Sequence, residues 1–237
     1  YSSPYWLKEK GTMGMYKVND KSILGYPEKL MKFPVKFHMS INNIDIDFER
    51  NIVYKFNDPV EGEVYHPFTV LPEVTCSIKE KVIIFSDQKS KKIPVHILAG
   101  KDNIEGVITL NSPEGWSIKP QSLSFSVEKK GDQSIVYFEV SPPKEISEGK
   151  LNPIIQIGEN AYDKELHTLD YKYIPLQQVL MESESKVVHL VLQKKGENIG
   201  YIEGAGDAVP ESLQQIGYQV TLINPTEISY DKLIQFD

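Results

Sequence analysis

The sequence has little cysteine, tryptophan or histidine, and it has no long apolar run. Cys76 is the only cysteine in 237 residues, so the chain can form neither an internal disulfide nor a thiolate metal cluster. The alternation of Cys76 with Ile78 favours a buried small hydrophobic residue over a nucleophile. No apolar run approaches the roughly 18 residues that a membrane span needs, and no stretch reads as a signal peptide. We therefore expect no membrane span and a stability that comes from packed cores.

Basic charge and clustered metal ligands are also scarce. A net charge of −7 argues against nucleic acid as a partner, because phosphate contacts need a basic surface. The histidines show no H-x-x-x-H or H-x-D spacing, and there is no G-x-S-x-G elbow. Three of them alternate with apolar neighbours and are expected on exposed strand faces. The sequence therefore predicts no catalytic residue, no metal site and no cofactor in this chain. The histidines are His38, His66, His96, His167 and His189, of which His38, His96 and His189 have the alternating pattern.

Short strand patterns dominate the N-terminal part, after a loop-like stretch over residues 1–30. Residues 31–41 alternate apolar and polar side chains, and residues 44–56 continue the pattern after Asn42-Asn43. These two runs predict an antiparallel hairpin joined by a tight turn. We assign residues 1–70 to a partial immunoglobulin-like β-sandwich. Two clear strands cannot close a core, so this part should lean on the second sandwich or on a neighbouring molecule.

The middle of the chain predicts a second sandwich, with a boundary near Leu71. Seven to eight short strands, separated by Gly, Pro, Asn and Lys-Lys-Gly-Asp turns, occupy residues 71–176, which is typical of an immunoglobulin-like domain. Residues 177–197 are expected to be a polar connector, LQQVLMESES, followed by the short strand KVVHLVL.

Residues 198–237 predict one βαβ unit: a strand, the helix AVPESLQQIG ending at Gly217, and a second strand. Two parallel strands cannot bury their own faces, so the unit is expected to open an α/β domain that is truncated here. The predicted fold class is therefore mainly β, with two Ig-like β-sandwich domains followed by a truncated α/β segment.

The turn Gly204-Ala205-Gly206-Asp207 leads into this helix, and Asp207 is predicted to be its N-cap. A dinucleotide fingerprint needs a third glycine, and Val209 stands at the position after Asp207-Ala208. Two interpretations stay open. Gly204, Gly206 and Asp207 form an ordinary strand–helix turn, or they form part of an incomplete ligand site.

Two tryptophans, Trp6 and Trp116, are the other candidate binding residues. Aromatic rings on the edge of a sandwich can stack on sugars. Trp116 follows a turn and precedes a strand, and such a residue commonly caps a sandwich core. Both tryptophans thus have a packing interpretation beside the glycan-stacking one.

Three blocks together resemble large bacterial PIG-L (LmbE-like) deacetylases. SSPYWLKE with YKFNDPVEGEVYHPFTVLPEVT is similar to the middle region of those proteins. SPEGWSIKPQSLSFSVEKKGDQSIVYFEVSPP is similar to their NEW3-type Ig-like domain, and IGYIEGAGDAVPESLQQIGYQVTLI to the start of a class I glutamine amidotransferase or ThuA-like domain. The resemblance implies a zinc-dependent N-deacetylase as the parent protein, located in the periplasm or secreted.

The deacetylase motif of that family, of the type A-H-P-D-D-E, has no counterpart here, because His66-Pro67 is followed by Phe68. No catalytic residue is therefore carried over, and zinc is expected only in the missing catalytic domain. We expect a non-catalytic accessory region of a deacetylase that acts on a glycan or glycoconjugate, with that catalytic domain as its partner. The alternatives are a carbohydrate-binding or adhesive sandwich module and a fragment of a small-molecule-binding α/β domain.

Overall fold

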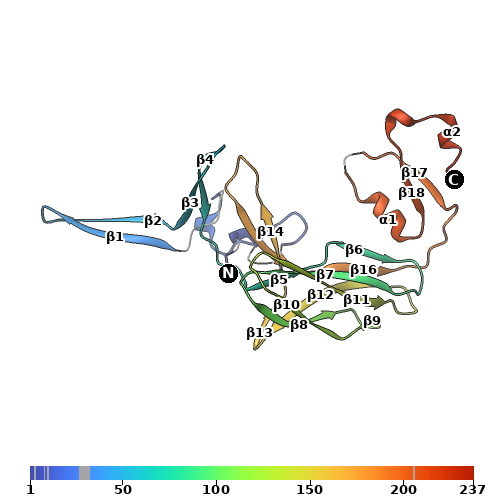
Figure 1. Ribbon diagram of the computed structural model, residues 1–237, viewed down its shortest axis with the longest axis horizontal. Helices are drawn as coiled ribbons and strands as arrows, with labels where there is room; N and C mark the ends of the chain where they lie inside the picture. Colours follow the sequence, from blue (N-terminus) through green and yellow to red (C-terminus); the bar gives the residue numbers. More distant parts are fainter. Residues whose placement is uncertain (3, 8, 10, 27–32, 205) are drawn as a thin grey trace. The chain divides into compact units, whose positions relative to one another are not determined.

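The computed structural model describes residues 1–2, 4–7, 9, 11–26, 33–204 and 206–237. The chain is mainly β, with several separate sheets, which confirms the mainly-β part of the predicted fold class (Figure 1). It divides into two compact units. Unit 1 comprises Tyr1–Thr75 and Lys164–Glu182, and unit 2 comprises Cys76–Asp163 and Ser183–Asp237. In the part of the chain that is described, no helix is long and apolar enough to cross a membrane.

Unit 1 consists of short loops and antiparallel hairpins. Its described strands pair as β1 with β2, β3 with β4 and β14 with β15, each pair forming a separate two-stranded sheet. Two single turns of 3-10 helix precede them. The bounds are η1 Tyr5–Leu7, η2 Lys21–Ile23, β1 Pro34–Ile41, β2 Ile44–Asn51, β3 Val53–Asp58, β4 Gly62–Pro67, β14 Lys164–Leu169 and β15 Gln177–Glu182.

The β1–β2 hairpin forms as the alternating sequence predicts. Asn42 and Asn43 join the strands with φ of 51° and 63°, in the left-handed region that asparagine tolerates in two-residue hairpin turns. Every residue of β1 is exposed, however, and β1–β2 shares no ladder with β3–β4. The described strands of residues 1–70 are thus separate hairpins. They do not form the two packed layers of the predicted partial sandwich, because their side chains do not enclose a common interior.

The strands of unit 2 that precede β17 (Asn198–Tyr201) form two sheets. One has the order β5-β7-β11-β9, and the other has the order β10-β8-β12-β16-β6 with β13 paired to β12. Strand β5 crosses the boundary between the units, which falls after Thr75. The bounds are β5 Val74–Ser77, β6 Val82–Phe85, β7 Lys91–Ala99, β8 Ile104–Asn111, β9 Ser117–Lys119, β10 Ser122–Val127, β11 Gln133–Ser141, β12 Ser147–Ile157, β13 Asn160–Tyr162 and β16 Ser185–His189.

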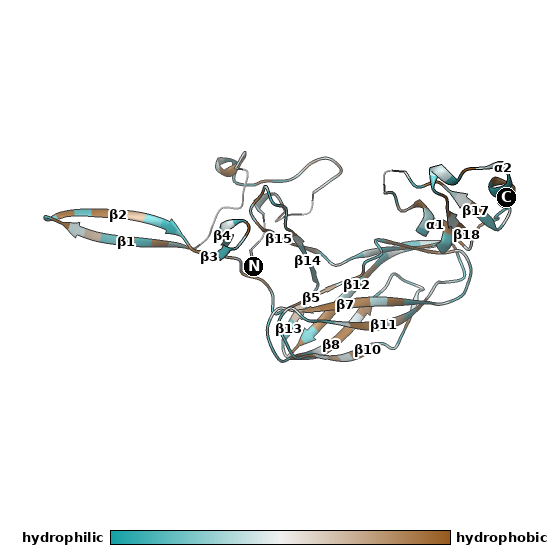
Figure 2. Ribbon diagram, turned by 45° about the horizontal axis from the view of Figure 1, so that its top comes forward, coloured by the Kyte–Doolittle hydropathy of each residue, from teal (hydrophilic) through white to brown (hydrophobic). Residues whose placement is uncertain are grey.

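The core of unit 2 follows from the alternation of side chains along these strands. On β7 the buried residues recur at every second position from Ile93 to Ala99, and β8 and β12 show the same period. Phe85 and Phe138 are fully buried and are the largest such side chains. Figure 2 shows hydrophobic residues alternating with hydrophilic ones along these strands. The arrangement is that of a β-sandwich, in which each sheet presents one apolar face to the other.

The expectation for residues 177–197 is met in part. Residues 177–182, expected in the polar connector, form β15, which pairs with β14, whereas the short strand expected at KVVHLVL is present as β16. Strand β16 pairs antiparallel with β12 and parallel with β6, so it belongs to the larger sheet of unit 2. The polar composition of LQQVLMESES suggested a linker. A hairpin that is exposed on one side carries the same composition.

The last part of unit 2 contains a parallel pair of strands, β17 Asn198–Tyr201 and β18 Gln219–Leu222, with helix α1 Val209–Gln215 between them. Gly217 follows the helix with φ of 94°, a conformation that glycine adopts at helix C-termini. The chain continues through η3 Pro225–Glu227 and α2 Tyr230–Leu233. Gly200 on β17 lies so close to Ile223 and Phe236 that a Cβ there would meet their side chains at 2.6 Å.

Candidate functional site

The turn between β17 and α1 holds three of the predicted site residues. A Cβ added at Gly204 or Gly206 would meet no atom within 4 Å, and Gly206 has φ of 73°. The positive φ of Gly206 explains why glycine occupies this position, because other residues rarely adopt it. Among the described residues, no close neighbour would clash with a side chain at Gly204 or at Gly206. The structure thus shows a turn with open space at both glycines.

Asp207 is not the N-cap of α1. Ala208 occupies that position and makes no side-chain capping bond. The two carboxylate oxygens of Asp207 accept hydrogen bonds from the Tyr201 hydroxyl at 2.8 and 2.9 Å, and Oδ1 also accepts from the Val209 N–H at 3.2 Å. The hydrogen bond to Asp207 raises the pKa of the Tyr201 hydroxyl. The Asp207 carboxylate thus forms an Asx-type turn one residue before the N-cap. The sequence pattern did not distinguish such a turn from an N-cap at Asp207.

Trp116 lies in the core of unit 2. Its side chain is 7% exposed, and its ring meets Phe85 edge-on, with centroids 5.0 Å apart and an interplanar angle of 77°. The indole N–H donates to the Ser147 hydroxyl at 3.0 Å, which satisfies its only polar group. This burial leaves no open ring face for a sugar, so the glycan-stacking interpretation of Trp116 does not fit the structure.

Trp6 belongs to unit 1, in η1, and is half-buried. Its ring contacts Tyr5 edge-on, with centroids 4.8 Å apart and an interplanar angle of 89°. The two tryptophans therefore lie in different units. The candidate binding residues do not form one site within either unit.

Several chemically reactive side chains are engaged in structural contacts. Cys76 is buried, and its thiol lies 3.5 Å from the Pro153 carbonyl oxygen. His38 is exposed as predicted and pairs with Asp47 at 2.7 Å. His189, predicted on an exposed face, is 2% exposed, because β16 lies inside the larger sheet. Among the described residues, no group of three or more His, Cys, Asp or Glu is placed to hold a metal ion.

The hydrogen bonds of His189 identify its tautomer. Its Nδ1 lies 2.8 Å from the Glu145 carbonyl oxygen, which can only accept, so Nδ1 carries the proton. Its Nε2 lies 3.1 Å from the Gln88 amide nitrogen, which can only donate, so Nε2 accepts. A neutral imidazole satisfies both neighbours. His189 thus links β16 to two loops of unit 2 as a structural residue.

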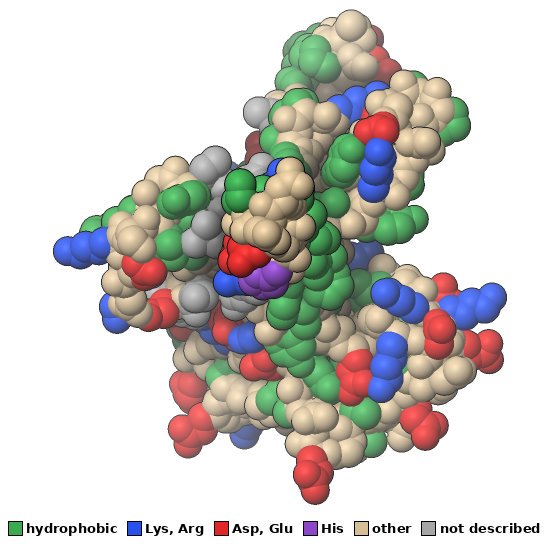
Figure 3. Space-filling view, turned by 90° about the vertical axis from the view of Figure 1, so that its left-hand side faces the viewer, with side chains coloured by type: hydrophobic (Ala, Val, Ile, Leu, Met, Phe, Trp, Pro, Cys, Tyr) green, Lys and Arg blue, Asp and Glu red, His purple; other side chains and the backbone are tan. Residues whose placement is uncertain are grey.

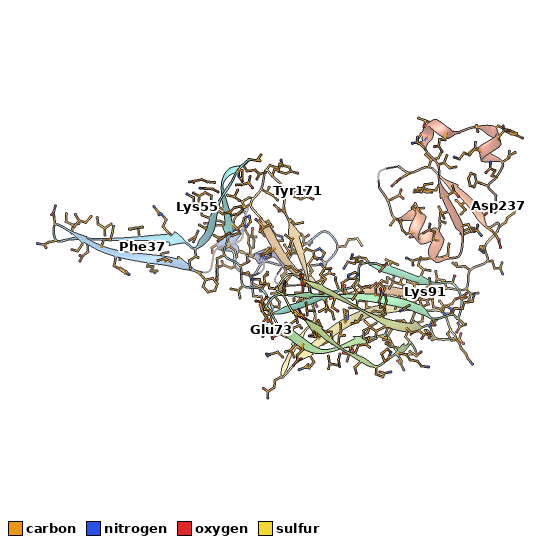
Figure 4. The ribbon with its side chains drawn as sticks, viewed as in Figure 1. Phe37, Lys55, Glu73, Lys91, Tyr171 and Asp237 are labelled. Carbon is orange, nitrogen blue, oxygen red and sulfur yellow. The ribbon has the colours of Figure 1, made fainter. Side chains whose placement is uncertain are left out.

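Sequence reasoning missed a polar contact at the edge of the larger sheet. The Gln215 side chain of α1 accepts from the Ile84 N–H at 2.7 Å and donates to the Val82 carbonyl oxygen at 3.3 Å. Lys91 Nζ donates to the carbonyl oxygens of Ile84 and Gln215. The amide of Gln215 thereby takes the place that a neighbouring strand would take along β6 (Figure 4 labels Lys91). No local signal in the sequence links a helix glutamine to a strand 131 residues away.

An exposed aromatic pair was missed as well. Tyr171 and Tyr173 lie in the loop between β14 and β15, with 54% and 82% of their surfaces exposed. Their rings are nearly parallel, with an interplanar angle of 15° and centroids 5.8 Å apart. The Y-K-Y spacing was the available signal in the sequence; the two rings are brought together by a turn, in which the Ile174 N–H donates to the Tyr171 carbonyl oxygen at 3.1 Å.

The chain matches no protein-family profile, and no curated protein matches it. Among solved structures, it is similar to WR4, a member of the MSP family from C. elegans. The TM-score is 0.28 and the sequence identity is 13%, and the match covers 50% of this chain and 98% of that chain. A likeness of this size carries no argument about function.

Proposed function

We propose that this chain is a non-catalytic accessory region of a PIG-L-type zinc N-deacetylase that acts on a glycan or glycoconjugate. In this proposal unit 2 contains an immunoglobulin-like domain of the NEW3 type. The residues from β17 onward begin a further α/β domain of the amidotransferase or ThuA-like type. The three sequence blocks quoted above support the assignment, and the parent enzyme is placed in the periplasm or outside the cell.

The observation that carries the proposal is that three side chains of unit 2 that could bind or react are engaged in structural contacts. Trp116 is packed on Phe85, Cys76 is buried, and His189 is a neutral bridge between backbone and side-chain partners. These groups stabilise a sheet-based scaffold, and each has a structural partner. A scaffold of this kind positions a catalytic domain or its substrate without taking part in the reaction.

Acetate release tests the proposal directly. The purified chain, incubated with Zn²⁺ and a panel of N-acetylated oligosaccharides, is expected to release no acetate above a blank without protein. Chain stripped of metal with a chelator is the matched control. Zinc-dependent release that co-purifies with the folded chain would overturn the assignment as non-catalytic.

A second experiment tests the accessory role. Deleting this region from the parent polypeptide should lower kcat/KM on a polymeric glycan and leave the rate on a small acetylated amide unchanged, because only the long substrate can reach beyond the catalytic domain. Equal losses on both substrates would indicate a folding defect. Unchanged rates on both would contradict an accessory role.

Carbohydrate binding is the second candidate function, and the Tyr171–Tyr173 pair favours it. Exposed, nearly parallel aromatic rings offer flat apolar faces of the kind on which sugar rings stack. Tyr173→Ala is then expected to abolish binding on a glycan array, whereas Tyr230→Ala, which removes another tyrosine with 80% exposure, should not. Binding that survives Tyr173→Ala, or no binding to any glycan, would count against this function.

The α/β alternative receives less support from the structure. The carboxylate of Asp207, held by the Tyr201 hydroxyl, stands before the first turn of α1. A negative charge at this position disfavours an anionic ligand, because like charges repel. We therefore do not propose a phosphate or nucleotide site at the Gly204–Asp207 turn.

A further inference from the structure

One face of the β1–β2 hairpin is formed by apolar side chains alone, apart from its open end. The register pairs Phe37 with Phe48, Met39 with Ile46 and Ile41 with Ile44, and Val35 lies opposite Arg50. Because successive residues of a strand point to opposite sides, these side chains share one face. We call it the apolar face of β1–β2; its members are Val35, Phe37, Met39, Ile41, Ile44, Ile46 and Phe48.

The apolar face is open to solvent. Six of its members are 40% to 64% exposed, the most exposed being Ile44 near the turn. Phe37 and Phe48 stack on each other, with ring centroids 4.8 Å apart and an interplanar angle of 12°. Figure 4 shows the labelled Phe37 on this hairpin, and Figure 3 views the molecule from the end where β1–β2 lies in Figure 1. Hydrophobic side chains stand at the surface there beside acidic, basic and histidine side chains.

The opposite face of the hairpin has the composition of a hydrated surface. Lys36 pairs with Glu49 at 3.0 Å, and His38 pairs with Asp47 at 2.7 Å, directly across the two strands. The hairpin is therefore amphipathic in the way of a strand pair that covers a core on one side and meets water on the other. A lone two-stranded hairpin is marginal in water, and a sheet face of this kind is normally buried against another layer.

We propose that a second copy of this chain covers the apolar face, hairpin against hairpin, in a two-fold symmetric dimer. With the two turns opposed, Phe37 and Phe48 of one copy lie over Met39 and Ile46 of the other. The single charged side chain in the row, Arg50, then falls at the rim, where it stays hydrated. Self-association of this kind is isologous, so one patch supplies both sides of the interface.

The area of the face suits a dimer. Six or seven side chains that are each about half exposed present about 500 Å² of accessible surface per copy. A dimer would therefore bury about 1,000 Å² in total, which is the lower limit for a specific interface. The charges disfavour an anionic membrane surface as the occupant. The hairpin carries Asp45, Asp47 and Glu49 against Lys36 on its opposite face and Arg50 at its open end, and the chain has a net charge of −7.

Sedimentation of the full chain tests the dimer. At about 100 μM the wild-type chain is expected to be dimeric, since a small interface of this type gives micromolar affinity. The double variant Phe37→Thr/Ile46→Thr keeps strand-forming residues but removes the centre of the face, so it should dissociate at least about tenfold more readily. The matched control is His38→Thr on the opposite face, which should leave the dimer unchanged.

Site-specific cross-linking locates the interface independently. Cys76 is buried, so a cysteine introduced at Met39 is the only reactive thiol of the Met39→Cys variant. Because Met39 of one copy lies over Phe37 of the other, a short bismaleimide is expected to join two copies of this variant covalently, whereas His38→Cys should not be joined. A monomeric wild-type chain at about 100 μM would overturn the proposal, and so would a dimer that persists in the double variant. Co-sedimentation of a monomeric chain with vesicles containing about 30% phosphatidylserine would overturn it in favour of a lipid surface.

Discussion

Trp116 and Trp6 show how differently one residue type is used in the two units. In sequence Trp116 follows a turn and Trp6 lies in a loop-like stretch, and both are compatible with packing or with stacking on a sugar. Burial separates them, because Trp116 is enclosed with Phe85 and bonded to Ser147, while Trp6 stays half-exposed beside Tyr5. The packing role of Trp116 was foreseeable from its place between a turn and a strand. Its partners were not, because Ser147 lies 31 residues away in sequence.

Replacing Trp116 should be costly to unit 2. Trp116→Ala removes a large buried ring and leaves a cavity beside Phe85, so we expect the free energy of unfolding to fall by about 3–5 kcal/mol. Urea denaturation followed by circular dichroism measures this loss. Trp116→Phe keeps a smaller ring in the core and loses the bond to Ser147, so it should cost less, about 1–2 kcal/mol. Equal stability of Trp116→Ala and wild type would show that the ring is not part of the core.

Asp58 at the end of β3 gives a prediction for pH. Its Oδ1 accepts hydrogen bonds from the N–H groups of Glu61 and Val60, at 2.9 and 2.8 Å, and these bonds lower the pKa of the carboxyl. Since the pKa is lower in the folded state than in the unfolded state, the stabilisation is complete above the ordinary aspartate pKa. It is lost as the pH falls through the lowered value.

Carboxyl NMR of Asp58 should therefore show a titration midpoint below that of an exposed aspartate. Over the same acidic range, the amides of Val60 and Glu61 should lose protection against exchange. Asp58→Asn keeps an acceptor oxygen but does not titrate, so in this variant the protection should no longer depend on pH. A normal midpoint for Asp58 would contradict the hydrogen bonds to this turn.

At the scale of elements, periodicity and turn chemistry predicted local structure well. The alternation in residues 31–41 and 44–56 and the pair Asn42-Asn43 led to the β1–β2 hairpin. Long-range partners were not predictable, because a strand's alternation says which side is buried and not which strand lies beside it. For this reason the strand predicted at KVVHLVL was found as β16, but its place between β12 and β6 in a sheet was not predicted.

The Gln215 side chain should protect the edge of β6 from water. Gln215→Ala removes one acceptor and one donor from the contacts to Ile84 and Val82, leaving that stretch of strand edge to water. One lost hydrogen bond is worth about 1 kcal/mol, so amide exchange at Ile84 should accelerate about fivefold. Hydrogen-exchange NMR or mass spectrometry measures the rate. Gln214→Ala, at the exposed neighbouring position on α1, should leave the rate unchanged; the same acceleration in both variants would indicate general weakening of the helix.

At the scale of the whole chain, the two units are interleaved in sequence. The chain leaves unit 2 after Asp163, forms β14 and β15 in unit 1, and re-enters unit 2 at Ser183. The Ser183 N–H donates to the Asp163 carbonyl oxygen at 3.0 Å, so the exit and the re-entry are adjacent. Residues 164–182 are thus an insertion between β13 and β16, two strands that both pair with β12. Sequence composition could not reveal this, because the insertion is itself a hairpin with ordinary strand alternation.

The insertion leads to a prediction about folding. A chain of residues 74–237, which keeps the whole of β5, should still fold when a two-residue Asn-Gly turn replaces residues 164–182, because the two ends to be joined are already hydrogen-bonded. Single-domain thermal unfolding and dispersed methyl NMR signals would show this. A matched deletion of residues 147–157 removes β12 from the centre of the larger sheet and should abolish folding. If the excised chain is unfolded while the full chain is folded, unit 2 depends on the inserted hairpin, and the two units are not separate folding domains.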